Sequence, residues 1–184
     1  MVSSDDSAAE RVLTSRRLYE GRIVALREDE VELPGGRRAF REVVEHADVV
    51  AVLPVAAAGR LLLVRQYRLP VGRALLELPA GGVDPGEGIE EAAQRELQEE
   101  IGHRAGRLER LGGFYVSPGY CTEFIRLFLA RDLTPSVLEA DHDEQITVEP
   151  VTFEEALRLV DAGEICDSKS IIGLLLAARE LGLR

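Results

Sequence analysis

The segment from Ile89 to Ile101 most constrains the fold, because it puts carboxylates on the apolar side of a predicted helix. At about 100° per residue, Glu96 and Glu100 fall almost in line with Ile89, on the side that also carries Leu97. Two like charges one turn apart on a buried side repel and lose hydration unless cations compensate them. The pattern therefore predicts raised pKa values or bound cations, and oxygen ligands favour Mg²⁺, with Mn²⁺ as the alternative.

Acidic helices usually present their charges to water, and Glu90 and Glu91 fit that interpretation. Glu99 lies at the edge of the side that carries Glu96 and Glu100, so it joins them as a candidate ligand. These three side chains point away from bulk water in the predicted helix.

Strand-like stretches flank this helix on both sides. The Pro34-Gly35-Gly36 turn between two alternating runs predicts an antiparallel hairpin, and the apolar run 49–53 predicts a strand covered on both faces. The first dozen residues are polar and small, and we expect them to fray. Strands interleave with few helices and no regular βαβ alternation, which predicts an α+β or α/β sandwich. Strands are expected at 22–32, 38–45, 49–55, 60–67, 75–78, 108–115, 123–130 and 145–148, and later helices at 153–161, capped by Thr152, and from 167 or 168 to 181.

The composition limits the class of function. A length of 184 residues with 46% hydrophobic residues fits one packed domain with a short extra segment. The net charge of −11 argues against a nucleic-acid partner, although cations held by carboxylates still permit a small anionic substrate. Cys121 and Cys166 form no CxxC pair, so a disulfide framework and a zinc site are unsupported. We expect a cytoplasmic protein, because no apolar run approaches the ~20 residues of a membrane span and the N-terminus lacks a signal-peptide layout.

One motif at fixed spacing resembles a known family. The pattern Gly-x5-Glu-x7-Arg-Glu-U-x-Glu-Glu-x-Gly-U, in which U is a bulky aliphatic residue, defines the Nudix box. His103 departs from it, because that position is usually aliphatic. The resemblance implies the Nudix α/β/α sandwich of mixed sheets, in which a strand, loop and helix hold Mg²⁺ against a pyrophosphate. The matching residues are Gly81, Glu87, Arg95, Glu96, Leu97, Glu99, Glu100 and Gly102.

The resemblance also implies roles for individual residues. Glu96 and Glu100 would be the main metal ligands, Glu99 would share a second ion or a bridging water, and the carbonyl of Ala80 would add an oxygen. Arg95 would orient a glutamate. Glu87 would either contact the metal ligands without binding the metal or serve as a distant ligand. For the base that activates water, the resemblance points to Glu144; a solvated loop is the alternative, and Asp143 and Glu99 are rival bases.

Further positions resemble the ADP-ribose pyrophosphatase branch of the family. Pro118 lies fifteen residues beyond His103, and Glu123 matches an acidic position that, with Pro118, lies where the branch reads the terminal ribose. Two upstream stretches, Arg41-Glu42-x-x-Glu45 and Gln66-Tyr67-Arg68, resemble those that hold the pyrophosphate and the adenine. Arg41 and Arg68 are therefore candidate phosphate clamps, with surface ion pairs as the alternative. Tyr19 or Tyr67 would stack on adenine, or else pack in the core.

The function implied is Mg²⁺-dependent hydrolysis of a nucleoside diphosphate sugar, with ADP-ribose giving AMP and ribose 5-phosphate. Alternatives are GDP-mannose, ADP-glucose or NADH as substrate, or a sensor that binds without cleaving. Sensors of this type lose glutamates of the box, whereas this chain keeps them. The resemblance further implies a homodimer, with residues 1–48 as strands that join two subunits, residues 49–184 as the Nudix domain, and Arg41 acting across the interface.

Overall fold

The computed structural model describes residues 8–139 and 145–182, which form two compact units. The first contains the described residues up to Ala47 together with Tyr115–Phe124. The second contains Asp48–Phe114 and the described residues from Ile125 onward. The loop 115–124 therefore belongs with a sheet that precedes it by some seventy positions in the sequence.

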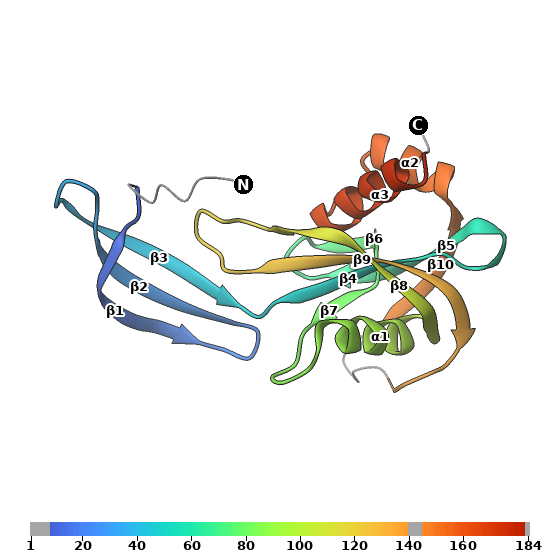
Figure 1. The fold of residues 1–184 in the computed structure, drawn as a ribbon, viewed down its shortest axis with the longest axis horizontal. Helices are drawn as coiled ribbons and strands as arrows, with labels where there is room; N and C mark the ends of the chain where they lie inside the picture. Colours follow the sequence, from blue (N-terminus) through green and yellow to red (C-terminus); the bar gives the residue numbers. More distant parts are fainter. Residues whose placement is uncertain (1–7, 140–144, 183–184) are drawn as a thin grey trace. The chain divides into compact units, whose positions relative to one another are not determined.

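The first unit is a three-stranded antiparallel sheet of β1 (Arg11–Glu20), β2 (Val24–Glu32) and β3 (Arg38–His46), in that order (Figure 1). The predicted hairpin is confirmed, because Gly35 and Gly36 adopt positive φ angles of 88° and 81° in the turn between β2 and β3.

Strand β1 is a difference from the sequence prediction. The expectation of a frayed start was wrong for Arg11 and Val12, which already lie in this strand. Nearly all of β1 is exposed, so it has no apolar periodicity by which it could be predicted. It is held instead by its ladder with β2 and by cross-strand ion pairs such as Arg11 with Glu32, at 2.6 Å.

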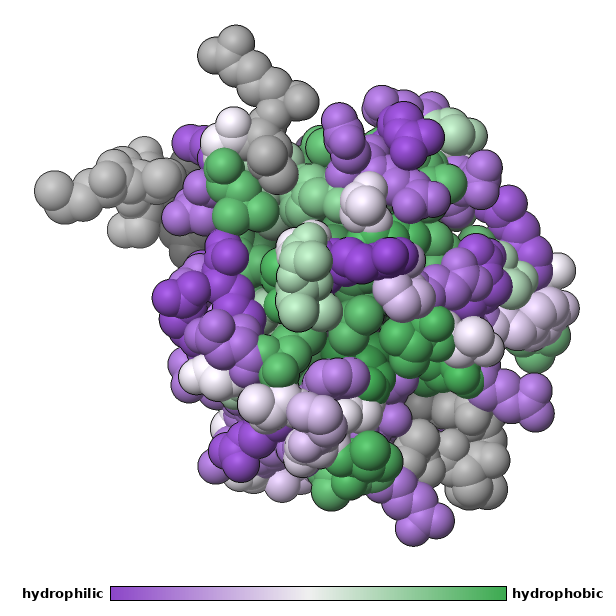
Figure 2. Space-filling view, turned by 90° about the vertical axis from the view of Figure 1, so that its right-hand side faces the viewer, coloured by the Kyte–Doolittle hydropathy of each residue, from purple (hydrophilic) through white to green (hydrophobic). Residues whose placement is uncertain are grey.

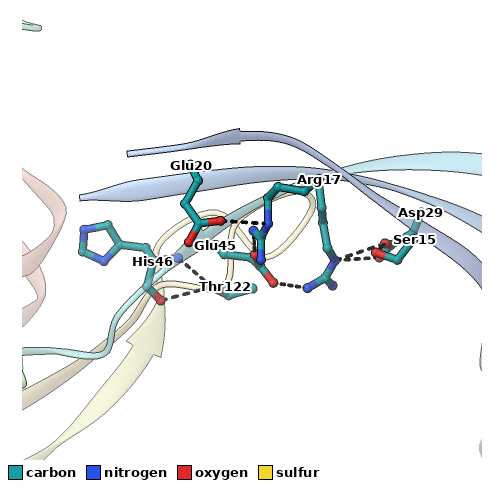
Figure 3. A network of polar contacts seen from close by, with 8 residues as sticks. Ser15, Arg17, Glu20, Asp29, Glu45, His46 and Thr122 are labelled. Atoms are coloured by element: carbon teal, nitrogen blue, oxygen red, sulfur yellow. Dashed lines mark hydrogen bonds and ion pairs between the residues drawn. The ribbon is translucent and has the colours of Figure 1, made fainter. Parts of the chain in front are cut away.

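The loop 115–124 is hydrogen-bonded to β3. The amide of Val44 donates to the carbonyl of Tyr120 at 2.7 Å, and the amide of Thr122 donates to the carbonyl of Val44 at 3.0 Å. Figure 3 shows the next contact, in which the amide of His46 donates to Oγ1 of Thr122 at 3.0 Å. These contacts bind the loop to β3 as a short parallel extension of the sheet.

The second unit contains two sheets and three α-helices. One sheet has the order β7-β4-β9-β8 and is mixed, because β4 runs parallel to β9 and antiparallel to β7. The other has the order β10-β5-β6. The strands are β4 (Val49–Pro54), β5 (Arg60–Arg68), β6 (Arg73–Glu77), β7 (Ala80–Gly82), β8 (His103–Tyr115), β9 (Phe124–Pro135) and β10 (Ile146–Thr152); the helices are α1 (Ile89–Glu100), α2 (Phe153–Asp161) and α3 (Ser168–Glu180), with a 3-10 turn at Ala57–Gly59.

The core is layered on both faces of β4, as the apolar run predicted. Val49, Ala51 and Leu53 pack with residues of α2 and α3, whereas Val50 and Val52 pack with residues of α1. In Figure 1, α1 lies on one side of these strands and α2 and α3 lie on the other. The predicted α/β/α sandwich is therefore confirmed; of its two sheets, β7-β4-β9-β8 is mixed and β10-β5-β6 is antiparallel.

Local capping explains where the helices begin. Oγ1 of Thr152 accepts a hydrogen bond from the amide of Glu155 at 3.1 Å, which confirms the predicted cap of α2. The carboxylate of Asp167 caps α3 in the same way, through the amide of Ser170. Helix α1 ends before Gly102, whose φ of 66° continues the chain in the left-handed region.

On the face drawn in Figure 2, hydrophobic side chains lie in the middle and hydrophilic side chains surround them. Within residues 8–139 and 145–182, no helix is long and apolar enough to cross a membrane.

Candidate active site

The carboxylates of α1 lie where the helical wheel placed them. Glu96 and Glu100 each retain only 6% of their accessible surface, whereas Glu99 is half-buried. The predicted apolar side forms around them, because Ala93 and Leu97 are fully buried. Two acidic groups thus lie inside the second unit at the junction of α1 and β7.

Gly81 makes room for one of these carboxylates. A Cβ on Gly81 would lie 2.1 Å from Oε1 and 2.4 Å from Oε2 of Glu96, far below any van der Waals contact. The same atom on the neighbouring Gly82 would meet nothing within 4 Å. A side chain at position 81 would therefore have to displace the Glu96 carboxylate, and the φ of Gly81 is not in the left-handed region.

The backbone of β7 also approaches the second buried glutamate. The amide of Ala80 donates to Oε2 of Glu100 at 3.0 Å, while Ala80 pairs with Ala51 of β4. The fold thereby brings together Ala80, Glu96 and Glu100, three of the residues named as ligands by the resemblance; the contact of Ala80 is made through its amide rather than its carbonyl.

Arg95 is the cation between the box carboxylates. It donates to both carboxylate oxygens of Glu87, at 2.9 and 3.0 Å. Its Nη1 donates to Glu96 at 2.6 Å and to Glu99 at 2.9 Å. Its Nη2 also donates to the carbonyl of Gly82 at 2.8 Å. The hydrogen bonds with Glu87 are the main reason that the pKa of Arg95 is raised, and the same contacts lower the pKa of Glu87. Arg95 thus orients three glutamates, and Glu87 in turn orients Arg95.

These residues fit a divalent cation by their chemistry. The side chains brought together are carboxylates, whose oxygens suit a hard cation, and Arg95 neutralises part of the charge of Glu96 and Glu99. In the part of the chain that the structure describes, no three acidic, histidine or cysteine side chains converge on one point. The reason is visible in the hydrogen bonds: Glu96 and Glu99 turn to Arg95, while Glu100 turns to the backbone of β7.

Arg68, a predicted phosphate clamp, is part of an ion-pair network in the second unit. Its Nε and Nη2 donate to the carboxylate of Glu77, with a shortest distance of 2.7 Å, and Nζ of Lys169 reaches the same carboxylate at 2.5 Å. Glu77 keeps only 1% of its surface. Burial opposes its ionisation most strongly, but the contacts with Arg68 and Lys169 together outweigh burial, so the pKa of Glu77 is lowered.

The remaining predicted substrate contacts belong to the first unit. Arg41 pairs with Glu10 through two hydrogen bonds of 2.9 and 2.6 Å. These hydrogen bonds are the main reason that the pKa of Arg41 is raised. Pro118 is exposed and Glu123 half-buried, and both lie in the loop 115–124. The core interpretation of the two tyrosines is wrong, because Tyr19 is 58% and Tyr67, in the second unit, 59% exposed.

The sequence did not single out a polar network across the three strands of the first unit (Figure 3). Asp29, only 3% exposed, accepts from Oγ of Ser15 at 2.6 Å and from Arg27 at 2.9 Å, and the contact with Ser15 contributes most to the lowering of its pKa. Glu45 accepts from both Arg17 and Arg27. Of these residues the sequence singled out only Glu45, as part of the Arg41-Glu42-x-x-Glu45 stretch; the others are polar residues among charged neighbours, so no local signal distinguished them.

Of the three candidate bases for activating water, only Glu99 lies among the described residues. Glu144 and Asp143 lie outside the described residues, so the structure does not test either of them. Glu99 is described, and its carboxylate is held by Arg95.

Comparisons with known proteins agree with this geometry. Residues 45–170 match the model of the NUDIX domain, and residues 10–44 match that of the nucleoside diphosphate sugar hydrolase N-terminal domain. An ADP-ribose pyrophosphatase of Bacillus subtilis (strain 168) is 40% identical over 168 residues, which cover 89% of this chain and 90% of that protein. One of Mycobacterium tuberculosis (strain ATCC 25618 / H37Rv) is 41% identical, covering 89% of this chain and 80% of that protein. A crystal structure of an ADP compounds hydrolase superposes with a TM-score of 0.85 at 25% identity, covering 94% of both chains.

Proposed function

Because the chain belongs to the Nudix family, we propose that it hydrolyses the pyrophosphate of a nucleoside diphosphate sugar with the help of a divalent cation. The substrate is ADP-ribose, and the products are AMP and ribose 5-phosphate. Two findings support this choice: the N-terminal segment matches a domain described for nucleoside diphosphate sugar hydrolases, and relatives similar over most of the chain are named ADP-ribose pyrophosphatases.

The observation that carries the proposal is the buried carboxylate of Glu96 against Gly81, next to Glu100 and the backbone of Ala80. Glu96, Glu100, Glu99 and the carbonyl of Ala80 hold the cation, which is Mg²⁺ in our proposal, with Mn²⁺ as a substitute. When bound, divalent cations neutralise the pyrophosphate oxygens and lower the charge barrier to attack by water. Arg95 keeps Glu96 and Glu99 oriented through its hydrogen bonds.

The other residues bind the substrate and move the proton. Arg68 contacts a phosphate oxygen, and Glu144 accepts the proton of the attacking water. In the first unit, Arg41 balances phosphate charge, while Tyr19 stacks on the adenine.

Selection of the sugar is assigned to the loop 115–124. Pro118 and Glu123 read the terminal ribose, so a compact sugar is preferred. We propose further that the enzyme is a cytoplasmic homodimer, in which the β1-β2-β3 sheet joins the subunits.

A substrate panel tests the function directly. ADP-ribose, GDP-mannose, ADP-glucose and NADH are incubated with Mg²⁺, and the products are identified. We expect AMP and ribose 5-phosphate, with kcat/KM for ADP-ribose at least about tenfold above the others, a difference of ~1.4 kcal/mol in transition-state binding. Glu123→Gln should reduce this preference more than it reduces the rate on a generic nucleotide sugar. A better substrate outside the ADP-ribose class would overturn the substrate but keep the family.

A further inference from the structure

The network around Glu77 joins three elements of the second unit at one buried carboxylate. Arg68 ends β5, Glu77 ends β6, and Lys169 lies in the first turn of α3. Lys169 is also held by Asp167, at 2.9 Å, and its side chain is only 11% exposed. A buried carboxylate with two cationic partners is fixed in place, because losing either partner leaves charge unpaired in the interior.

Glu77 is also linked to the candidate site by a short and well-held backbone. The amide of Leu78 donates to the fully buried Oγ of Ser170 at 2.8 Å, and the carbonyl of Pro79 accepts from the amide of Val52 at 2.9 Å. The next residue is Ala80, whose amide contacts Glu100. Three residue steps span at most about 11 Å, so the backbone at Glu77 lies within that distance of the backbone at Ala80.

The contact with Glu77 sets the direction of the Arg68 guanidinium. Both Nε and Nη2 of Arg68 point to the same carboxylate, and two parallel contacts fix the plane of a guanidinium as a single contact cannot. With this pair formed, 35% of the Arg68 side chain remains accessible. An oriented and accessible guanidinium is suited to an anionic ligand.

We propose that Glu77 is a positioning residue: its carboxylate, anchored by Lys169, holds the guanidinium of Arg68 in the orientation that binds a phosphate of the nucleotide sugar. The inference rests on the proposed function, in which Arg68 contacts the substrate. It adds Glu77 and Lys169 as residues that act through Arg68 and touch no substrate themselves.

A double-mutant cycle tests this inference. Wild type, Arg68→Ala, Glu77→Gln and the double variant are compared on ADP-ribose at saturating Mg²⁺, and the Kd for ADP-ribose is measured in parallel by calorimetry with Ca²⁺. We expect each single change to raise KM about tenfold or more while kcat changes less than about threefold. The double variant should be no worse than Arg68→Ala within about twofold, because Glu77 has nothing to position once Arg68 is gone.

The same strand supplies a matched control. Arg65 pairs with Glu149 through contacts of 2.5 and 2.9 Å, and neither residue is assigned to the site. Glu149→Gln should leave KM within about twofold of the wild type. Effects of Arg68→Ala and Glu77→Gln that multiply in the double variant, or an unchanged KM in Glu77→Gln, would overturn the inference.

Two further outcomes are distinguishable. If Glu77→Gln does not fold, as judged by circular dichroism, Lys169→Met replaces it in the cycle with the same expectation, and an unchanged KM there overturns the inference. If ADP-ribose is not a substrate, the proposed substrate is wrong. The double-mutant cycle is then measured with whichever nucleotide sugar the enzyme cleaves, so the inference is still tested. If none is cleaved, the Kd values alone decide the inference.

Discussion

The carboxylate of Glu96 lies in the space that the side chain of any residue other than glycine would occupy at position 81. A Cβ there would lie 2.1 Å from Oε1 and 2.3 Å from Cδ of Glu96. The absence of a side chain at Gly81 leaves room for this carboxylate between β7 and α1, close to the point where the amide of Ala80 meets Glu100. It ties the box glycine to the box glutamates through sterics, independently of any ligand.

Gly81→Ala should therefore reduce kcat/KM by about 100-fold or more. The methyl group must displace the Glu96 carboxylate, and a shift of about 1 Å in a reacting group can cost this much. Steady-state kinetics with Mg²⁺ measures the loss. Gly82→Ala is the control, since its Cβ meets nothing within 4 Å, and it should keep near-normal activity. Equal activities of the two variants would contradict the steric argument.

Removing the charge of a buried glutamate should abolish catalysis. We expect Glu96→Gln or Glu100→Gln to lower kcat by about two to three orders of magnitude without loss of fold, because a ligand charge and transition-state stabilisation are lost together. Circular dichroism checks the fold. Glu90→Gln, an exposed position on the same helix, should retain activity. Near-normal turnover of either buried variant at saturating Mg²⁺ would refute the assignment of the ligands.

Glu144→Gln should separate proton transfer from metal binding. If Glu144 accepts the proton of water, its amide variant slows hydrolysis while the Mg²⁺ concentration for half-maximal rate changes little. A titration of rate against Mg²⁺ measures both quantities. A wild-type rate in this variant would transfer the role to Asp143 or Glu99.

The ion pairs of Glu77 should appear in the pH dependence of stability. Because the pKa of Glu77 is lowered in the folded chain, its stabilisation is complete above the unfolded value of about 4.3 and is lost as the pH falls through the folded value. The difference in free energy of unfolding between wild type and Glu77→Gln should thus be largest near about pH 6–7 and shrink below about pH 4. Urea denaturation at a series of pH values measures it. The more exposed Glu149 should give a smaller difference, and a pH-independent difference for Glu77 would exclude the ionic explanation.

The first unit should join two copies of the chain. It exposes large apolar side chains, with Val12 at 53% and Phe40 at 65% in its strands and Ile23 at 62% in the turn between β1 and β2. Light scattering at micromolar concentration should show a dimer. An active monomer under those conditions would be incompatible with the proposed assembly.

Local sequence by itself determined α1 and its buried acids. Glu96 and Glu100 share a side with Leu97 because the helical period places them there, whatever surrounds the helix. Caps and turns were equally local, since Thr152 bonds the backbone three residues ahead and Gly35 needs only its own φ angle. Fixed spacing of this kind can be read directly from the chain.

Only the tertiary structure decided which distant groups meet. Glu77 pairs with Lys169 across 92 positions, and Arg11 of the exposed strand β1 finds Glu32 across 21. With 22 basic and 33 acidic residues, the sequence allows many such pairs, and none has a periodicity. Packing of the layers selects among them, because it fixes which strand ends and helix ends lie side by side before any charge can be paired.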